Sequence, residues 1–167
     1  DTLERAVAHA ALDAQADGAD VAVTAIARDP SQFPANEREE GWLGAESVVE
    51  EIRAMGRRAI AIDLDVTSDE QVADAIARTT AELGELTGLV NNAGIASEAA
   101  AASIAEMDDA LWYSTVDINL NGVYRMSRAG VRAMLAHGRP SAVVNISSLA
   151  GRFGFANYGG YCASKFG

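Results

Sequence analysis

Short apolar runs alternate with longer segments of helical periodicity along the chain. The short runs are rich in valine, isoleucine and alanine, which predicts strands buried on both faces. The longer segments repeat their apolar residues at intervals of three and four, which predicts amphipathic helices. The predicted strands are Asp20–Ile26, Arg58–Leu64, Leu86–Val90 and Ala142–Ile146, and the predicted helices are Leu3–Ala16, Trp42–Met55, Asp69–Leu83, Met107–His137 and Tyr158–Phe166. This alternation predicts an α/β fold with a doubly wound parallel sheet, in three layers α/β/α.

Local signals mark the ends of several predicted elements. Gly56 follows a helical segment and suits its end, because glycine tolerates the left-handed backbone that closes many helices. Ser68, with Gln71 three residues later, resembles a capping box that opens the helix Asp69–Leu83. We also expect a break near the start of the long helix Met107–His137.

Composition indicates one globular domain over residues 1–167. The 167 residues are 49% hydrophobic with a mean hydropathy of +0.03, which suffices for one sizeable core and is short for two ordinary domains. The formal net charge is -11, which argues against nucleic acid or an anionic membrane surface as a partner. No segment approaches the roughly 18 uninterrupted apolar residues of a membrane helix, and no secretory leader is evident, so we expect a cytoplasmic protein.

Two residue types argue against other kinds of site. Cys162 is the only cysteine, so no internal disulfide is possible, and we expect it to fill space in a helix. His9 and His137 lie outside any metal-ligand spacing, so no metal site is expected.

The strongest chemical signal is a tyrosine and a lysine four residues apart. Tyr161 and Lys165 would share one face of a predicted helix. An ammonium beside a phenol stabilises the phenolate, so the pair could act as a general acid or base. Ser148 follows the apolar run Ala142–Ile146, which we expect to be a buried strand, so its hydroxyl would lie where ligands bind in open α/β sheets. Taken alone, a Tyr-Lys pair of this spacing is more often a solvated helix face, and the other motifs of the chain decide against that interpretation.

The ordered set of motifs resembles the classical short-chain dehydrogenase/reductase family. It comprises the turn Asn91-Asn92-Ala93-Gly94, then Asn119, Ser148 and the Tyr161-x-x-x-Lys165 pair. The resemblance implies a Rossmann-like fold and hydride transfer between a nicotinamide cofactor and an alcohol or carbonyl substrate. The spacing to Tyr161 favours Ser148 over Ser147 as the catalytic hydroxyl.

The resemblance also implies a role for each catalytic residue. Tyr161 would exchange a proton with the substrate oxygen, and Ser148 would hydrogen-bond that oxygen. Lys165 would bind the nicotinamide ribose and stabilise the phenolate. Asn119 would hold a water that links Lys165 to solvent. The alternative for Asn119 is a polar residue that satisfies helix backbone at a kink.

The cofactor implied by the resemblance is NADP or NAD. Besides Tyr161 and Lys165, the matching positions are Asp65 and Val66 beside the adenine, and Asn92, Ala93 and Gly94 beside the nicotinamide ribose. Without the resemblance, Asp65 would be a helix cap and the three later residues an ordinary turn.

The choice of dinucleotide depends on the end of the second strand of the family. An acidic residue there favours NAD, whereas a nearby arginine accommodates the phosphate of NADP. Ala25 stands about where the acid is expected, and Arg28 follows, so NADP is favoured. The alternative is that Arg28 is a solvated loop charge.

Two parts of the family pattern have no counterpart in this sequence. The family begins with a strand and a glycine-rich turn that holds the pyrophosphate, yet no glycine precedes Gly18. The strands that follow the Tyr-Lys helix are also missing. We therefore expect a partial domain from the interior of a longer enzyme, whose parent would be a homodimer or homotetramer. The alternative is a catalytically silent fragment or an interaction module on the same fold, since the glycine turn is absent.

Overall fold

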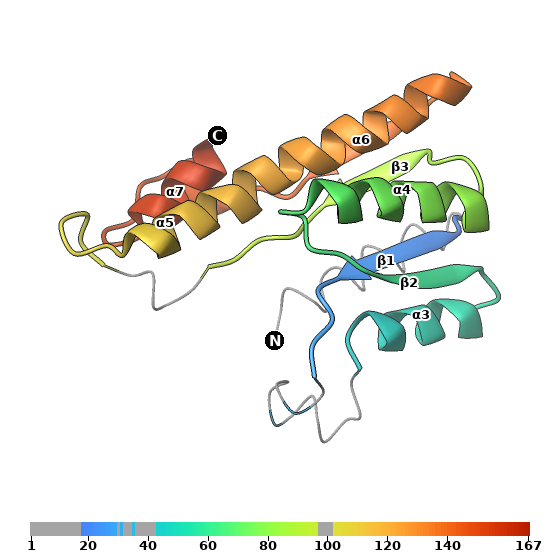
Figure 1. The fold of residues 1–167 in the computed structure, drawn as a ribbon, viewed down its shortest axis with the longest axis horizontal. Helices are drawn as coiled ribbons and strands as arrows, with labels where there is room; N and C mark the ends of the chain where they lie inside the picture. The colour runs from blue at the N-terminus through green and yellow to red at the C-terminus, as the bar shows by residue number, and fades with distance from the viewer. Residues whose placement is uncertain (1–17, 30, 32–34, 36–42, 97–101) are drawn as a thin grey trace. The chain divides into compact units, whose positions relative to one another are not determined.

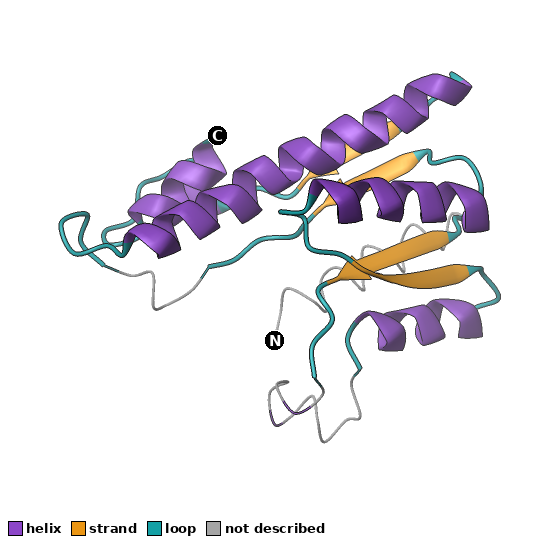
Figure 2. Cartoon of the chain, viewed as in Figure 1, coloured by secondary structure: helices purple, strands orange, loops and turns teal. Residues whose placement is uncertain are grey.

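The computed structural model describes residues 18–29, 31, 35, 43–96 and 102–167, and their strands and helices alternate as predicted (Figures 1 and 2). The strands are β1 (Val21–Ala25), β2 (Ala59–Asp63), β3 (Gly88–Asn91) and β4 (Ala142–Asn145). The α-helices are α3 (Ala45–Ala54), α4 (Asp69–Leu83), α5 (Asp109–Val116), α6 (Gly122–His137) and α7 (Gly159–Phe166). A π-helical segment (Asp117–Asn121) joins α5 to α6, and a short 3-10 helix (Leu149–Gly151) follows β4. The predicted helix Leu3–Ala16 lies outside the described residues.

The chain divides into two compact units. The first comprises Asp1–Asp65 with Ala73–Glu85, and the second comprises Val66–Val72 with Leu86–Gly167. Helix α4 contributes residues to both. The single domain over residues 1–167 stays a prediction.

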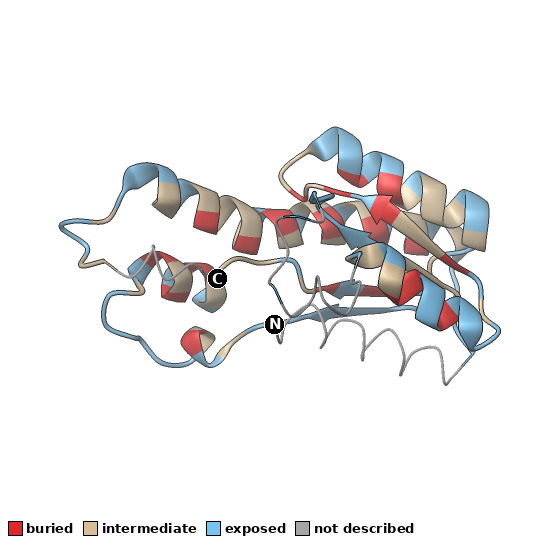
Figure 3. Ribbon diagram, turned by 90° about the horizontal axis from the view of Figure 1, so that it is seen from below, coloured by how far each residue is buried: buried red, intermediate tan, exposed pale blue. Residues whose placement is uncertain are grey.

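In the first unit, α3 packs on a parallel pair of strands. β1 pairs with β2 from Val21 opposite Ala59 to Ala25 opposite Asp63. The buried cluster on this pair joins strand and helix residues, namely Val23, Val48, Val49, Ile52 and Ala59. Ile52 has no exposed surface. The helices carry buried and exposed residues side by side (Figure 3), as the amphipathic spacing predicted.

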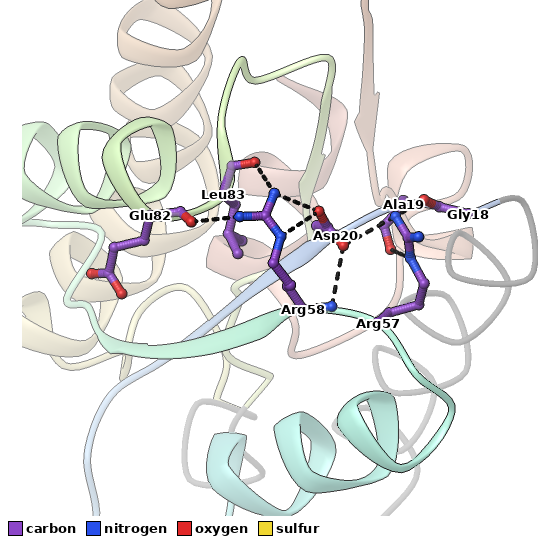
Figure 4. A network of polar contacts seen from close by, with 7 residues as sticks. All are labelled: Gly18, Ala19, Asp20, Arg57, Arg58, Glu82 and Leu83. Atoms are coloured by element: carbon purple, nitrogen blue, oxygen red, sulfur yellow. Dashed lines mark hydrogen bonds and ion pairs between the residues drawn. The ribbon is translucent and has the colours of Figure 1, made fainter.

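A charged network joins the amino ends of β1 and β2 to the carboxyl end of α4 (Figure 4). The Asp20 carboxylate accepts hydrogen bonds from Arg58 Nε at 2.9 Å and from the Arg58 backbone N–H at 3.1 Å. It also pairs with Arg57 at 3.0 Å. The Arg58 guanidinium further donates to the carbonyls of Glu82 and Leu83, at 3.0 and 2.7 Å. A cation suits that place, because the last carbonyls of a helix lack partners within it.

In the second unit, a buried asparagine joins both strands to a helix. β3 pairs with β4 in parallel, from Gly88 opposite Ala142 to Asn91 opposite Asn145. The Asn91 amide donates to Asn145 Oδ1 and to Ser127 Oγ on α6, both at 2.8 Å. Both amide hydrogens of Asn91 thus have an acceptor, as a buried polar group requires.

The long helix predicted over Met107–His137 is confirmed, and so is the break near its start. The Asp108 side chain caps the first turn by accepting from Leu111 N–H at 2.9 Å. The break is the π-helical segment, where the Asp117 carboxylate accepts from Asn121 and Arg125, both at 2.9 Å. The hydrogen bond from Asn121 and then that from Arg125 hold the pKa of Asp117 below its usual value.

The other predicted boundaries agree with the structure to within a few residues. One half of the predicted capping box is present, since the Ser68 hydroxyl accepts from Gln71 N–H at 3.3 Å. The expectation of a buried strand at Ala142–Ile146 was wrong, because all four residues of β4 are exposed. In the part of the chain that the structure describes, β4 pairs with β3 alone, so its side chains keep much of their surface accessible. None of the described helices is both long and apolar enough to span a bilayer.

The Asp20 network predicts an acid-dependent loss of stability. Chiefly through its side-chain hydrogen bond, Arg58 holds the pKa of Asp20 below the ordinary 3.8. A depressed pKa in the folded state means that the ionised carboxylate stabilises the fold above pH 3.8 and that this is lost as pH falls through the lower value. We expect Asp20→Asn to lower the unfolding midpoint at neutral pH, with the difference from wild type shrinking in acid.

The matched control for this test is Arg78→Ala. It removes the ion pair between Arg78 and Glu82 on the exposed side of α4. Exposed helix pairs of this spacing stabilise a fold by about 0.3–0.5 kcal/mol. Equal destabilisation by Arg78→Ala and Asp20→Asn in thermal unfolding at neutral pH would contradict a special role for the network.

A second prediction concerns the packing of the 3-10 helix on α7. A Cβ added at Gly151 would collide with the backbone oxygen of Lys165 and would lie 2.7 Å from Ser147 Oγ. We expect Gly151→Ala to cost about 1–3 kcal/mol, as overpacking does. Gly154→Ala is the control, since a Cβ there meets no atom within 4 Å. Urea denaturation measures both, and equal losses would refute the collision.

Candidate active site

Helix α7 presents Tyr161 and Lys165 on the same side. The Lys165 Nζ lies 5.9 Å from the centroid of the Tyr161 ring, within the range of a cation–π contact. The predicted shared face is therefore confirmed. The ammonium also donates to the carbonyl oxygen of Ile146 at 3.1 Å, just beyond the carboxyl end of β4.

The Lys165 ammonium is partly withdrawn from solvent. Burial lowers the pKa of its ammonium below the ordinary 10.5. It is also the only lysine of the sequence, in which the other basic side chains are arginines and two histidines. An ammonium is a compact point charge that can release its proton, whereas a guanidinium stays charged.

Asn119 occupies the centre of the π-helical segment and is 3% exposed. Its Oδ1 accepts from the Ile95 N–H at 2.7 Å, and its Nδ2 donates to the Ile95 carbonyl at 2.9 Å. The Nδ2 also donates to Ser164 Oγ at 3.0 Å. These bonds reach the segment after β3 and helix α7, so the side chain does more than satisfy its own helix at a kink.

Gly94 brings the turn after β3 next to both residues. A Cβ at Gly94 would lie 3.2 Å from Asn119 Oδ1 and 3.6 Å from Lys165 Nζ. The amide oxygen and the ammonium thus flank the same point beside the glycine. A side chain at this position would crowd the amide oxygen, so glycine lets the Asn119 side chain lie close to the turn.

Two serines follow β4 and make different contacts. Ser148 begins the 3-10 helix, and its Oγ accepts from the Ala150 N–H at 3.2 Å. Ser147 Oγ instead donates to the Lys165 carbonyl at 3.4 Å. Both residues lie just after Ile146, whose carbonyl holds the Lys165 ammonium.

The remaining predicted cofactor residues fall in different places. Asn92 is half-buried and Ala93 is exposed, both directly after β3. Val66 is buried in the second unit, where its Cγ2 would lie 2.6 Å from a Cβ at Gly122, so it has a packing role. Asp65 is half-buried in the first unit.

The predicted dinucleotide determinant lies in the first unit. β1 ends at Ala25, and Arg28 is exposed in the segment that follows. The Asp63 carboxylate accepts from the Ala27 N–H at 2.7 Å, which joins this segment to the end of β2. Asp29, next to Arg28, accepts from Ser31 N–H at 2.8 Å.

Sequence reasoning missed three residues that build the site. Ile95 and Ile146 take part through backbone atoms, which carry no side-chain signature. Ser164 takes part through its hydroxyl and could have been noticed as a polar residue directly before Lys165. Among the residues that the structure describes, no group of three or more histidine, cysteine, aspartate or glutamate side chains is placed to hold a metal ion.

Comparison with solved structures confirms the Rossmann-like α/β fold. A crystal structure of carveol dehydrogenase from Mycobacterium avium in complex with NAD superposes with a TM-score of 0.80 at 29% identity. The match covers 96% of this chain and 56% of that protein.

Curated relatives agree with this comparison. The chain is 40% identical over 124 residues to cis-4-hydroxycyclohexanecarboxylate dehydrogenase of Sinomonas cyclohexanicum. It is 37% identical over 124 residues to 3-oxoacyl-(acyl-carrier-protein) reductase FabG of Pseudomonas aeruginosa. Each match covers 74% of this chain and 49% of the relative, so the chain spans about half the length of these proteins. The sequence model of the short chain dehydrogenase family matches residues 13–167, and the chain therefore belongs to that family.

Proposed function

We propose that the protein transfers hydride between a nicotinamide dinucleotide and an alcohol or carbonyl substrate. The observation that carries this proposal is the convergence of Gly94, Asn119 and Lys165 at one point, with Tyr161 under the lysine ammonium. A half-buried cation beside a phenol, next to a glycine turn, is suited to proton exchange with a bound oxygen.

The residues at this point suit the ribose side of such a dinucleotide. Gly94 has no side chain that would keep a ligand from the backbone, and Asn92 and Ala93 belong to the same turn. The Lys165 ammonium has three donors, of which one bond to Ile146 is seen, and further donors suit hydroxyl oxygens. When bound, the dinucleotide supplies or accepts the hydride.

Tyr161 and Ser148 act on the substrate oxygen. Tyr161 donates a proton to a carbonyl oxygen during reduction and takes the hydroxyl proton during oxidation, and the Lys165 ammonium stabilises its phenolate. Ser148 donates a hydrogen bond to the same oxygen. Its Oγ accepts from Ala150, which leaves its hydrogen available for donation. Loss of one such donor costs roughly 3 kcal/mol of barrier in comparable sites.

Asn119 completes a path for the proton. Its Oδ1 and the Lys165 Nζ flank the space beside Gly94, where both can bind the same water molecule. A proton that leaves Tyr161 then reaches solvent through Lys165 and that water. Asn119 keeps this geometry because its amide is fixed by the Ile95 backbone.

We also propose which residues hold the adenosine end of the dinucleotide and which dinucleotide is used. Asp65 and Val66 are proposed at the adenine, and Arg28 favours NADP over NAD through the extra phosphate. That the longer protein is a homodimer or homotetramer, and that it lies in the cytoplasm, stay predictions. Two substrate probes follow from the named relatives: cis-4-hydroxycyclohexanecarboxylate for oxidation and 3-oxoacyl-(acyl-carrier-protein) for reduction.

Replacing the proposed proton donor tests this function directly. In the whole protein we expect Tyr161→Phe to lower turnover of a probe by about 10²–10⁴-fold, because proton transfer is lost. Dinucleotide binding, followed by fluorescence with NADPH and NADH, should remain measurable. Tyr124→Phe is the control, since that tyrosine is exposed on α6 outside the site. Near-normal turnover in Tyr161→Phe would remove Tyr161 from the mechanism, and an inactive wild type would favour the silent alternative.

The partly desolvated ammonium of Lys165 gives a prediction that needs no substrate. Burial lowers the pKa of Lys165, so between that lowered value and 10.5 the unfolded chain binds more protons than the folded chain. Wild-type stability therefore gains from this group as pH rises through that interval. Lys165→Met keeps the apolar stem and lacks the charge. We expect the free energy of unfolding of wild type to increase relative to Lys165→Met from neutral pH toward 10.5. A difference independent of pH would show that Lys165 is not desolvated.

A further inference from the structure

Ser164 lies between Tyr161 and Lys165 and has no part in the proposed chemistry, yet it is 3% exposed. Its hydroxyl donates to the Tyr161 carbonyl oxygen at 2.8 Å and accepts from Asn119 Nδ2 at 3.0 Å. A hydroxyl has one hydrogen, so the bond to Tyr161 leaves the oxygen lone pairs directed to Asn119. The buried hydroxyl is therefore used both as a hydrogen-bond donor and as an acceptor.

Asn119 depends on this hydroxyl because each of its two amide hydrogens has one acceptor, and the hydroxyl is one of them. One goes to the Ile95 carbonyl and the other to Ser164 Oγ. The two bonds with Ile95 attach Asn119 to the segment that follows Gly94, and the bond with Ser164 attaches it to α7. Without the hydroxyl, a buried N–H loses its acceptor and Asn119 loses a hydrogen bond to the helix that carries Lys165.

We propose that Ser164 is a positioning residue that holds Asn119 and the Ile95 segment at a fixed place against α7. In this way it keeps the Asn119 Oδ1 beside the Lys165 ammonium, with Gly94 between them. The kinetic consequence rests on the proposed function, because only there does the spacing between Asn119 and Lys165 affect proton transfer. The structural consequence does not depend on any reaction.

The structural test is hydrogen exchange at the Ile95 amide, which is bonded to Asn119 Oδ1. In Ser164→Ala we expect this amide to exchange about tenfold faster than in wild type, after correction for the global stability of each variant. Ser127→Ala is the matched control, because Ser127 Oγ likewise accepts from a buried asparagine amide, that of Asn91, at 2.8 Å. Unchanged exchange at Ile95 in Ser164→Ala, or equal acceleration in both variants, would overturn the proposal.

The kinetic test uses the pH dependence of kcat/KM in the whole protein, with cis-4-hydroxycyclohexanecarboxylate as probe. We expect Ser164→Ala to lower kcat about tenfold and to move the profile toward higher pH by about half a unit, since Lys165 then passes a proton less readily to the water that Asn119 is proposed to hold. Ser164→Thr, which keeps a hydroxyl, should recover most of the rate, and Ser127→Ala should leave the profile in place.

The two tests separate the positioning role from the proposed function. A slower Ser164→Ala enzyme with an unchanged pH profile would mean that Ser164 only stabilises the fold, which overturns the proposal. If the wild-type protein turns over no probe, the proposed function fails, and hydrogen exchange at Ile95 still decides whether Ser164 fixes Asn119.

Discussion

The candidate active site in the second unit depends on the hydrogen bonds of the buried Asn119 amide. Its side chain joins the segment after β3, the π-helical segment and α7, which are far apart in the sequence. Because a buried amide must satisfy its donors and acceptor, these three segments can occupy only a narrow range of positions. The π-helical segment is itself held from the outer side by Asp117 with Asn121 and Arg125. A local irregularity of one helix thus sets the geometry of the candidate active site.

The sequence contained enough information for most of the fold and for the principal site residues. The order of strands and helices followed from periodicity, because amphipathic spacing reports the face that a segment buries. Tyr161 and Lys165 lie together as their spacing in a helix requires. The burial of β4 did not follow in this way. An apolar run shows that a strand could be buried, whereas its actual burial depends on which other elements pack against the strand.

Other parts of the site leave little trace in a sequence. The carbonyl of Ile146 and the backbone of Ile95 contribute through atoms that every residue possesses. Their roles depend on how segments meet in space. The lowered pKa of Lys165 likewise results from burial, which its position in the motif does not specify. Lysine usage gave an unused clue, since this chain otherwise relies on arginine and histidine for its basic side chains.

The polar network around Asp20 and Arg58 lies at one end of the paired strands of the first unit, and the segment that carries Arg28 lies at the other. It fixes β1 and β2 at their amino ends, whereas Arg28 follows the carboxyl end of β1. In a parallel pair these ends are opposite, so the register of the strands does not rely on the segment that carries Arg28. A change of sequence in that segment can therefore leave the alignment of the two strands intact.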